Sequence, residues 1–174
     1  MKIYKLTTEK LKELKTWAQV KSPKTFQPVL SYALDWLAPE LLGTGFRLFE
    51  INEFEMKAII PANKSNFDSQ NEIHQGLVTN AGLELARAFL QRQMPESFFK
   101  IVATDIHLSK KQKWSDEIKL VLKSNQADMD EFFMHLQRGK KSNVQFEVTI
   151  AAEKFRKNDS LEIKLVIEST PLIA

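Results

Sequence analysis

The chain has 174 residues, of which 43% are hydrophobic and 27% charged, a composition typical of a globular domain rather than a disordered chain. It carries 25 basic and 22 acidic residues, and its lysines are spread along the chain instead of gathered as in a nucleic-acid binder. The absence of cysteine excludes disulfides, thiolate metal ligands and a cysteine nucleophile, and it fits a cytoplasmic protein. No uninterrupted apolar run exceeds three residues, against about 18 for a membrane-spanning helix, so we expect no membrane span and no signal peptide.

The first 40 residues are predicted to form two helices. Apolar residues recur at helical spacing between a threonine cap and Pro23, which ends the first helix. Pro28 lies in the first turn of the second helix, and Pro39 ends it. The sequence therefore divides into an N-terminal helical extension, 1–40, and one folded domain, 41–174.

The spacing of apolar residues changes to two after Gly43 and Gly45, and this alternation is typical of strands with one buried face. The predicted strands cover 46–51, 54–60, 98–108, 118–122, 144–150 and 161–167. A polar loop rich in asparagine covers 62–72. A second polar run, 156–160, is expected to form the turn before the last strand.

Two helices are predicted between these strands. The first, 76–93, is apolar on nearly every side, and helices of this kind are usually buried. A shorter helix, capped by Asp128 and ended by Gly139, is expected to place its apolar residues in the core. Strands on both sides of one apolar helix indicate an α+β fold with an antiparallel sheet packed around that helix.

Three motifs, taken in order, resemble those of a known superfamily. They are His74-Gln75-Gly76, Asn80-Ala81-Gly82-Leu83-Glu84-Leu85 and Ile106-His107-Leu108-Ser109-Lys110-Lys111. Together with the order of elements they resemble the hotdog-fold thioesterases, especially the PaaI-like branch and relatives with an N-terminal helical extension. The resemblance covers about 41–170 and implies an antiparallel sheet wrapped around the central helix, with acyl-thioester sites between two joined subunits.

The resemblance also implies roles for the residues at the start of the buried helix. In the family a backbone amide there polarises the thioester carbonyl, and a carboxylate on the helix activates water or attacks. This places His74, Gln75 and Gly76 at the oxyanion position and makes Glu84 the candidate general base. The positive end of a helix dipole stabilises a developing oxyanion, and glycine permits a close approach to the backbone. The family carboxylate usually lies nine residues after the histidine, where this chain has Leu83.

Five further residues are candidates for substrate binding. Asp68 and Asn71 stand where the family often has an asparagine and a glycine, and Asn71 tolerates the same left-handed backbone. Asn80 lies on the polar stripe of the buried helix, and Lys110 and Lys111 are expected to meet the phosphates of coenzyme A. Flexible lysines contact phosphate as point charges and need no fixed spacing, so a charged strand end facing water explains them equally well.

Structural readings of the same residues remain open. Glu84 either acts as a base or simply pairs with Arg87 or accepts a hydrogen bond from Asn80 on the polar stripe. Asp105 and His107 alternate on one strand face, as solvated cross-strand partners or as a catalytic pair. The three histidines are scattered without ligand spacing, so we expect no metal site.

The sequence therefore predicts a cytoplasmic thioester hydrolase acting on acyl-CoA or an acyl-carrier-protein thioester, without a cofactor beyond the coenzyme A of its substrate. The alternatives are a non-catalytic acyl or lipid binder and an enoyl-thioester hydratase or dehydratase on the same fold. Neither a nucleic-acid partner nor a membrane span is expected. An apolar helix needs cover from all directions and an open sheet edge invites pairing, so a homodimer or tetramer is predicted.

Overall fold

The computed structural model describes residues 41–93, 99–139, 141–152 and 159–169. In chain order these form β1 (Arg47–Ile51), β2 (Glu55–Ile60), α3 (Gln75–Gln93), β3 (Phe99–Ser109), β4 (Ile118–Lys123), α4 (Gln126–Gly139), β5 (Lys141–Ala152) and β6 (Asp159–Ser169). The two helices expected within 1–40 lie outside the described residues. No helix in the described ranges is long and apolar enough to cross a bilayer.

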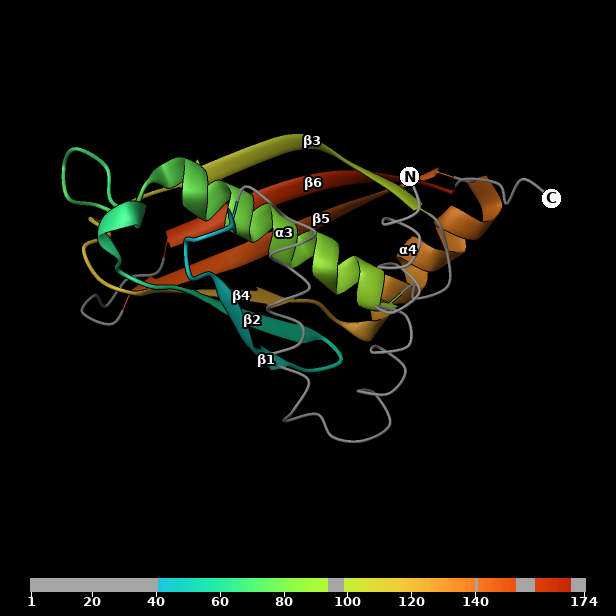
Figure 1. Cartoon of the computed structure of the whole chain (residues 1–174). Helices are drawn as coiled ribbons and strands as arrows, with labels where there is room; N and C mark the ends of the chain where they lie inside the picture. The colour runs from blue at the N-terminus through green and yellow to red at the C-terminus, as the bar shows by residue number, and fades with distance from the viewer. Residues whose placement is uncertain (1–40, 94–98, 140, 153–158, 170–174) are drawn as a thin grey trace, which may run out of the picture.

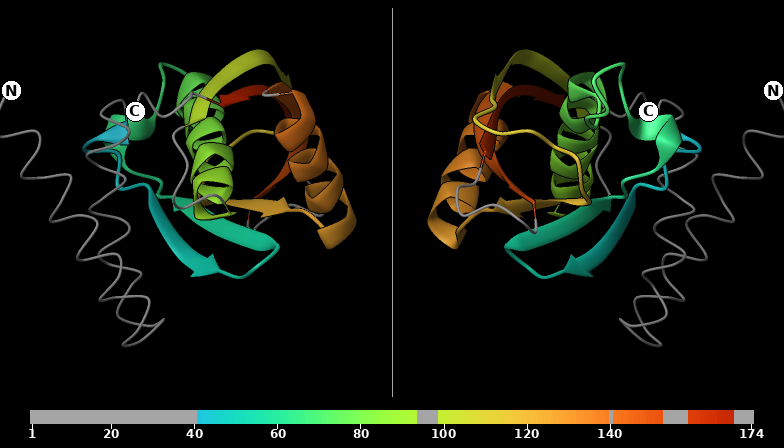
Figure 2. Two further views of the ribbon diagram at one scale, coloured as in Figure 1. Left: turned by 90° about the vertical axis from the view of Figure 1, so that its right-hand side faces the viewer. Right: turned by 90° about the vertical axis from the view of Figure 1, so that its left-hand side faces the viewer.

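The strands form one antiparallel sheet around α3. Their order is β1-β2-β4-β5-β6-β3, so β1 and β3 are the edges. Helix α3 runs along the sheet and contacts β2, β3, β4 and β6 (Figure 1). Seen from either end, the strands curve partly around this helix (Figure 2). The predicted α+β fold with an antiparallel sheet and a central apolar helix is confirmed for the described residues.

The alternation that predicted the strands is the alternation of burial. On β6, Leu161, Ile163 and Ile167 are fully buried, whereas Glu162 and Lys164 between them are exposed. Successive side chains of a strand point to opposite faces, so one face packs on α3 and the other meets water. This pattern fixes the register, because a slip of one residue would bury the charged face.

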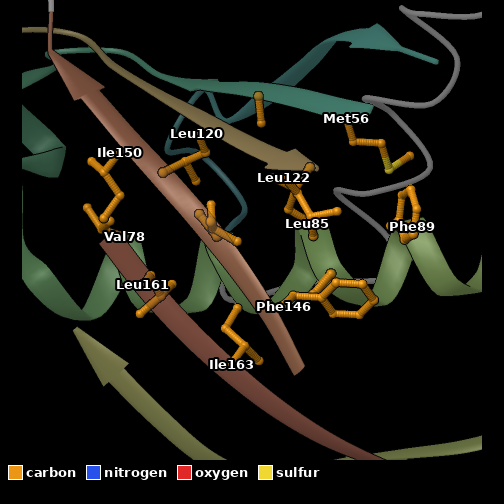
Figure 3. Packing of buried hydrophobic residues seen from close by; sticks show 14 of the residues in the cluster. Met56, Val78, Leu85, Phe89, Leu120, Leu122, Phe146, Ile150, Leu161 and Ile163 are labelled. Atoms are coloured by element: carbon orange, nitrogen blue, oxygen red, sulfur yellow. The ribbon is translucent and has the colours of Figure 1, made fainter. Parts of the chain in front are cut away.

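Helix α3 packs closely on the sheet through a small residue. Its buried side chains include Val78, Leu85 and Phe89, which meet buried residues of the strands (Figure 3). A Cβ added to Gly82 would lie 2.3 Å from Cδ2 of Leu161, so the absence of a side chain lets the helix backbone approach β6. The glycine in the middle of the helix is therefore a packing residue.

Two of the boundaries that differ from the sequence prediction involve polar residues with defined partners. The cap of α4 is Asn125, three residues before the predicted Asp128: Asn125 Oδ1 accepts the backbone N–H of Asp128 at 2.9 Å. Asn125 also donates through Nδ2 to the Asp128 carboxylate, so Asp128 belongs to the first turn. Asp159, assigned to a turn as part of a polar run, begins β6 and is fully buried. The Asn125 cap is a local contact that begins the helix earlier than predicted, whereas Asp159 has distant partners that local spacing does not reveal.

Candidate functional site

His74 caps the start of α3. Its carbonyl accepts the N–H of Val78, and its Nδ1 accepts the N–H of Gly76 at 3.0 Å. A Cβ on Gly76 would lie 3.0 Å from the imidazole, so glycine gives the ring room to lie against the helix start. His74 and Gln75 are exposed, and Gly76 is half-buried. We call His74, Gln75 and Gly76 the helix mouth; a carbonyl oxygen that takes the Gly76 N–H must replace the imidazole.

The loop before the helix mouth is shaped by Asp68 and Asn71. Asp68 Oδ1 accepts the N–H groups of Gln70 at 2.8 Å and Glu72 at 3.2 Å, and these two donors hold the pKa of Asp68 below its ordinary value. Asn71 has φ 57°, which confirms the predicted left-handed backbone. The side chain of Asp68 and the backbone of Asn71 therefore shape this loop locally.

Asn66 joins three segments at the helix mouth and was not singled out from the sequence. The residue is 2% exposed, and its Nδ2 donates to the carbonyls of Thr44 and Pro61, each at 2.8 Å. Its own carbonyl accepts the N–H of His74 at 2.9 Å. Because all of these partners are backbone atoms or distant residues, an asparagine in a polar loop gave no signal of this role.

Lys110 is partly buried next to this loop. Its Nζ is 2.5 Å from Oε2 of Glu72, a residue 5% exposed, and 4.8 Å from the ring centroid of Trp114. Lys113 is a more distant and mostly exposed partner, at 3.7 Å from Oε1 of the same carboxylate. The hydrogen bond from Lys110 holds the pKa of Glu72 below its ordinary value.

Trp114 is held from both sides. Its Nε1 donates to Oδ2 of Asp159 at 2.7 Å, and both residues are fully buried. Oδ1 of Asp159 accepts the backbone N–H of Lys111 at 2.7 Å. The carbonyl of Trp114 accepts the N–H of Ile73, the residue immediately before His74, at 2.8 Å. The start of β6, the segment after β3 and the helix mouth thus meet at one end of the molecule.

Glu84 lies away from the helix mouth. It is eight residues beyond Gly76 on α3, which corresponds to about 12 Å along the helix axis. It is 5% exposed, and Oε1 accepts a hydrogen bond from Nη1 of Arg87, so the predicted structural pairing is confirmed. Asn80, one turn closer to the mouth, is exposed. Within one chain, the structure gathers the candidate residues of the loop, the helix mouth and the segment after β3, but not Glu84.

Asp105 and His107 are cross-strand surface residues. Oδ2 of Asp105 is 3.0 Å from Nζ of Lys164 on β6, and both side chains are about half exposed. His107 is exposed and faces Glu162 in the register. The solvated cross-strand interpretation is therefore confirmed. Among the described residues, no group of three histidine or acidic side chains is arranged to hold a metal ion.

Comparisons with known proteins identify the architecture. No protein-family model and no curated protein matches the sequence. A protein of unknown function from Chlorobaculum tepidum superposes with a TM-score of 0.72 at 13% identity, over 88% of this chain and 100% of that one. A Pseudomonas aeruginosa protein described as a probable thioesterase gives 0.69 at 10% identity, over 82% and 95%. The phenylacetic acid degradation protein PaaI of Thermus thermophilus gives 0.54 at 10% identity, over 75% and 98%.

The chain has the hotdog fold. At these identities the likeness concerns the fold alone. In hotdog terms, α3 is the helix that the sheet wraps, and β1 is the edge strand beside β2.

Proposed function

We propose that the protein is a thioesterase that hydrolyses an acyl thioester of coenzyme A or of an acyl carrier protein. The observation that carries this proposal is the start of α3, where a half-buried glycine presents its N–H next to an exposed histidine on a fold shared with proteins described as thioesterases. The same residues on another fold would give much weaker support for a thioesterase.

The proposed chemistry is polarisation of the thioester carbonyl at the helix mouth. The carbonyl oxygen displaces the imidazole of His74 and accepts the N–H of Gly76, aided by the positive end of the α3 dipole. Attack of water on the carbonyl carbon places negative charge on that oxygen, where the amide stabilises it. Collapse of the intermediate breaks the C–S bond and releases the thiol and the acid. One such donor contributes about 100-fold to 1,000-fold in kcat.

We propose Glu84 as the general base that takes the proton from water, acting on the helix mouth of a second copy. Its distance of about 12 Å from Gly76 along the same helix excludes direct action within one chain. Strand β3 is an edge of the sheet, and its Val102 is 38% exposed. Pairing of two β3 edges about a two-fold axis would join the sheets into a homodimer.

We further propose that coenzyme A is bound at the segment after β3. Lys111 is exposed there, and its backbone N–H is held by Asp159. Its flexible ammonium group could therefore contact a phosphate while its main chain stays in place. Asn80, exposed on α3, is proposed to contact the acyl portion, and Gln75, also exposed, belongs to the proposed oxyanion position beside Gly76.

The test is thiol release from acyl-CoAs of different chain length, with paired substitutions at Gly76. Gly76→Pro removes the N–H, and proline is tolerated in the first turn of a helix, whereas Gly76→Ala adds a comparable Cβ but keeps the N–H. We expect Gly76→Pro to lose about 100-fold or more in kcat and Gly76→Ala to lose far less. Equal activity of the two variants would refute the amide assignment, and an active Glu84→Gln would refute the base.

The pairing of Glu84 with Arg87 favours a second candidate function. A carboxylate that is hydrogen-bonded by a guanidinium is less available to take a proton from water, which fits a non-catalytic acyl or lipid binder. An enoyl-thioester hydratase is the other alternative on the same fold. Native mass spectrometry that detects a co-purified acyl ligand, without turnover of any acyl-CoA, would support the binder. Hydration of an enoyl-CoA, measured as the loss of its ultraviolet absorbance, would support the hydratase.

A further inference from the structure

The segment after β3 latches the loop that leads into the helix mouth. Lys110 contacts the carboxylate of Glu72 at 2.5 Å, and the carbonyl of Trp114 accepts the N–H of Ile73 at 2.8 Å. These two contacts fix the two residues directly before His74. We call Glu72, Lys110, Trp114 and Asp159 the latch.

The side chains of the latch are largely buried. Trp114 and Asp159 are fully buried, Glu72 is 5% exposed, and the side chain of Lys110 is 20% exposed. Its ammonium contacts both the Glu72 carboxylate and the face of the Trp114 ring, and the indole N–H of that ring donates to Asp159. An exposed ion pair contributes little to folding stability. A largely buried pair that also packs on a fixed aromatic ring is held in a single arrangement. The charge of Lys110 is therefore committed to holding Glu72.

We propose that Lys110, acting through Glu72, is a positioning residue that aims the Gly76 amide. This inference rests on the proposed thioesterase function and assigns Lys110 to the support of the helix mouth, in place of the expected contact with a coenzyme A phosphate. Loss of the Lys110 charge removes the nearest partner of the buried Glu72 carboxylate and so weakens the support of the backbone that leads to His74, whose side chain caps Gly76. A displacement of about 1 Å at a reacting group can cost about 100-fold in rate.

Two substrates separate a positioning role from a phosphate contact. One is an acyl-CoA, and the other is the same acyl group on pantetheine, which has the thioester but no phosphate. A positioning residue affects both substrates equally, through kcat. A phosphate contact affects only the coenzyme A ester, through KM.

The experiment compares Lys110→Met with Lys110→Arg, which keeps the charge, and with Lys164→Met, which breaks an exposed ion pair to Asp105 on the same sheet. We expect Lys110→Met to lower kcat about 10-fold to 100-fold on both substrates with KM within about twofold. Lys110→Arg is expected to recover most of the loss, and Lys164→Met to leave both constants unchanged. A Lys110→Met defect confined to the KM of the coenzyme A ester would overturn the proposal.

Hydrogen exchange measures the latch without any turnover. We expect the amides of Ile73 and Gly76 to exchange faster in Lys110→Met than in the wild type, and unchanged exchange there would overturn the proposal. If Lys110→Met does not fold, the double variant Glu72→Gln/Lys110→Met removes both charges and is subjected to the same measurements. A wild type without thioesterase activity would refute the proposed function, while the exchange data would still decide whether the latch holds the helix mouth.

Discussion

Replacing Gly82 with alanine is expected to destabilise the protein because the new methyl group collides with β6. The added Cβ would lie 2.3 Å from Cδ2 of Leu161, whereas carbon atoms in contact lie about 3.5–4.0 Å apart. Leu161 is fully buried, so its side chain has little room to move. Overpacking of this kind costs about 1–3 kcal/mol. Alanine recovers up to about 1 kcal/mol through its higher helix propensity.

A double-mutant cycle with Leu161→Ala isolates the collision. Leu161→Ala alone is expected to cost about 2–5 kcal/mol because it leaves a cavity. In that background the methyl of Gly82→Ala has space, and the substitution is expected to stabilise by about 1 kcal/mol through helix propensity. The helix-propensity gain is the same in both backgrounds and cancels, so the two substitutions couple by the overpacking cost of about 1–3 kcal/mol, in the range for residues in contact.

The assay is urea unfolding followed by circular dichroism, with equal m-values as the condition for comparing free energies. The control is the same cycle with Leu120→Ala. Leu120 is a fully buried residue of β4, and none of its atoms is among those nearest to the added Cβ. That cycle is expected to be additive within about 0.5 kcal/mol. Additivity in the Leu161 cycle would refute the close approach of α3 to β6.

Three further predictions concern charge, capping and assembly. Because Lys110 lowers the folded-state pKa of Glu72 below its ordinary 4.5, the carboxylate stabilises the protein above that pH and loses this contribution as pH falls through the folded-state pKa. Urea unfolding at several pH values should therefore show the advantage of wild type over Glu72→Gln shrinking below about pH 4.5, and a constant difference would contradict the pairing. Asn125→Ala should cost about 1 kcal/mol by uncapping α4, whereas Gln126→Ala beside it should stay within about 0.5 kcal/mol, and equal effects would contradict the cap. Light scattering at micromolar concentration should give at least twice the chain mass of 20.1 kDa, and a monomer mass would exclude the shared site.

The sequence predicted the sheet well because one face of each strand is buried against α3. Alternation on β6, from Leu161 to Ile167, is visible without any knowledge of neighbours. The apolar character of α3 likewise follows from the sheet that surrounds it. Both signals are local, so a reading along the chain finds them.

The contacts that build the helix mouth were not predictable in this way. Asp159 lies 45 residues from the Trp114 side chain that it accepts from, and it stands in a polar run typical of a turn. Asn66 reaches back 22 residues to the carbonyl of Thr44. Lys110 looked like one member of a solvated cluster, although its partner Glu72 lies 38 residues earlier. Pairings between distant segments depend on the fold and leave no periodic trace in the sequence.

The position of Glu84 on α3 links the catalytic assignment to the assembly. A shift from the ninth to the tenth residue after His74 turns the side chain by about 100° but changes its height along the helix by only about 1.5 Å. Either position, Leu83 or Glu84, is therefore about 10–12 Å along the axis from Gly76, beyond the reach of a carboxylate to a carbonyl bound there. A base at this height can serve a helix mouth only if that mouth belongs to another copy. In the proposed mechanism a monomeric chain would therefore keep its oxyanion donor and lose its base, so the role proposed for Glu84 requires the homodimer.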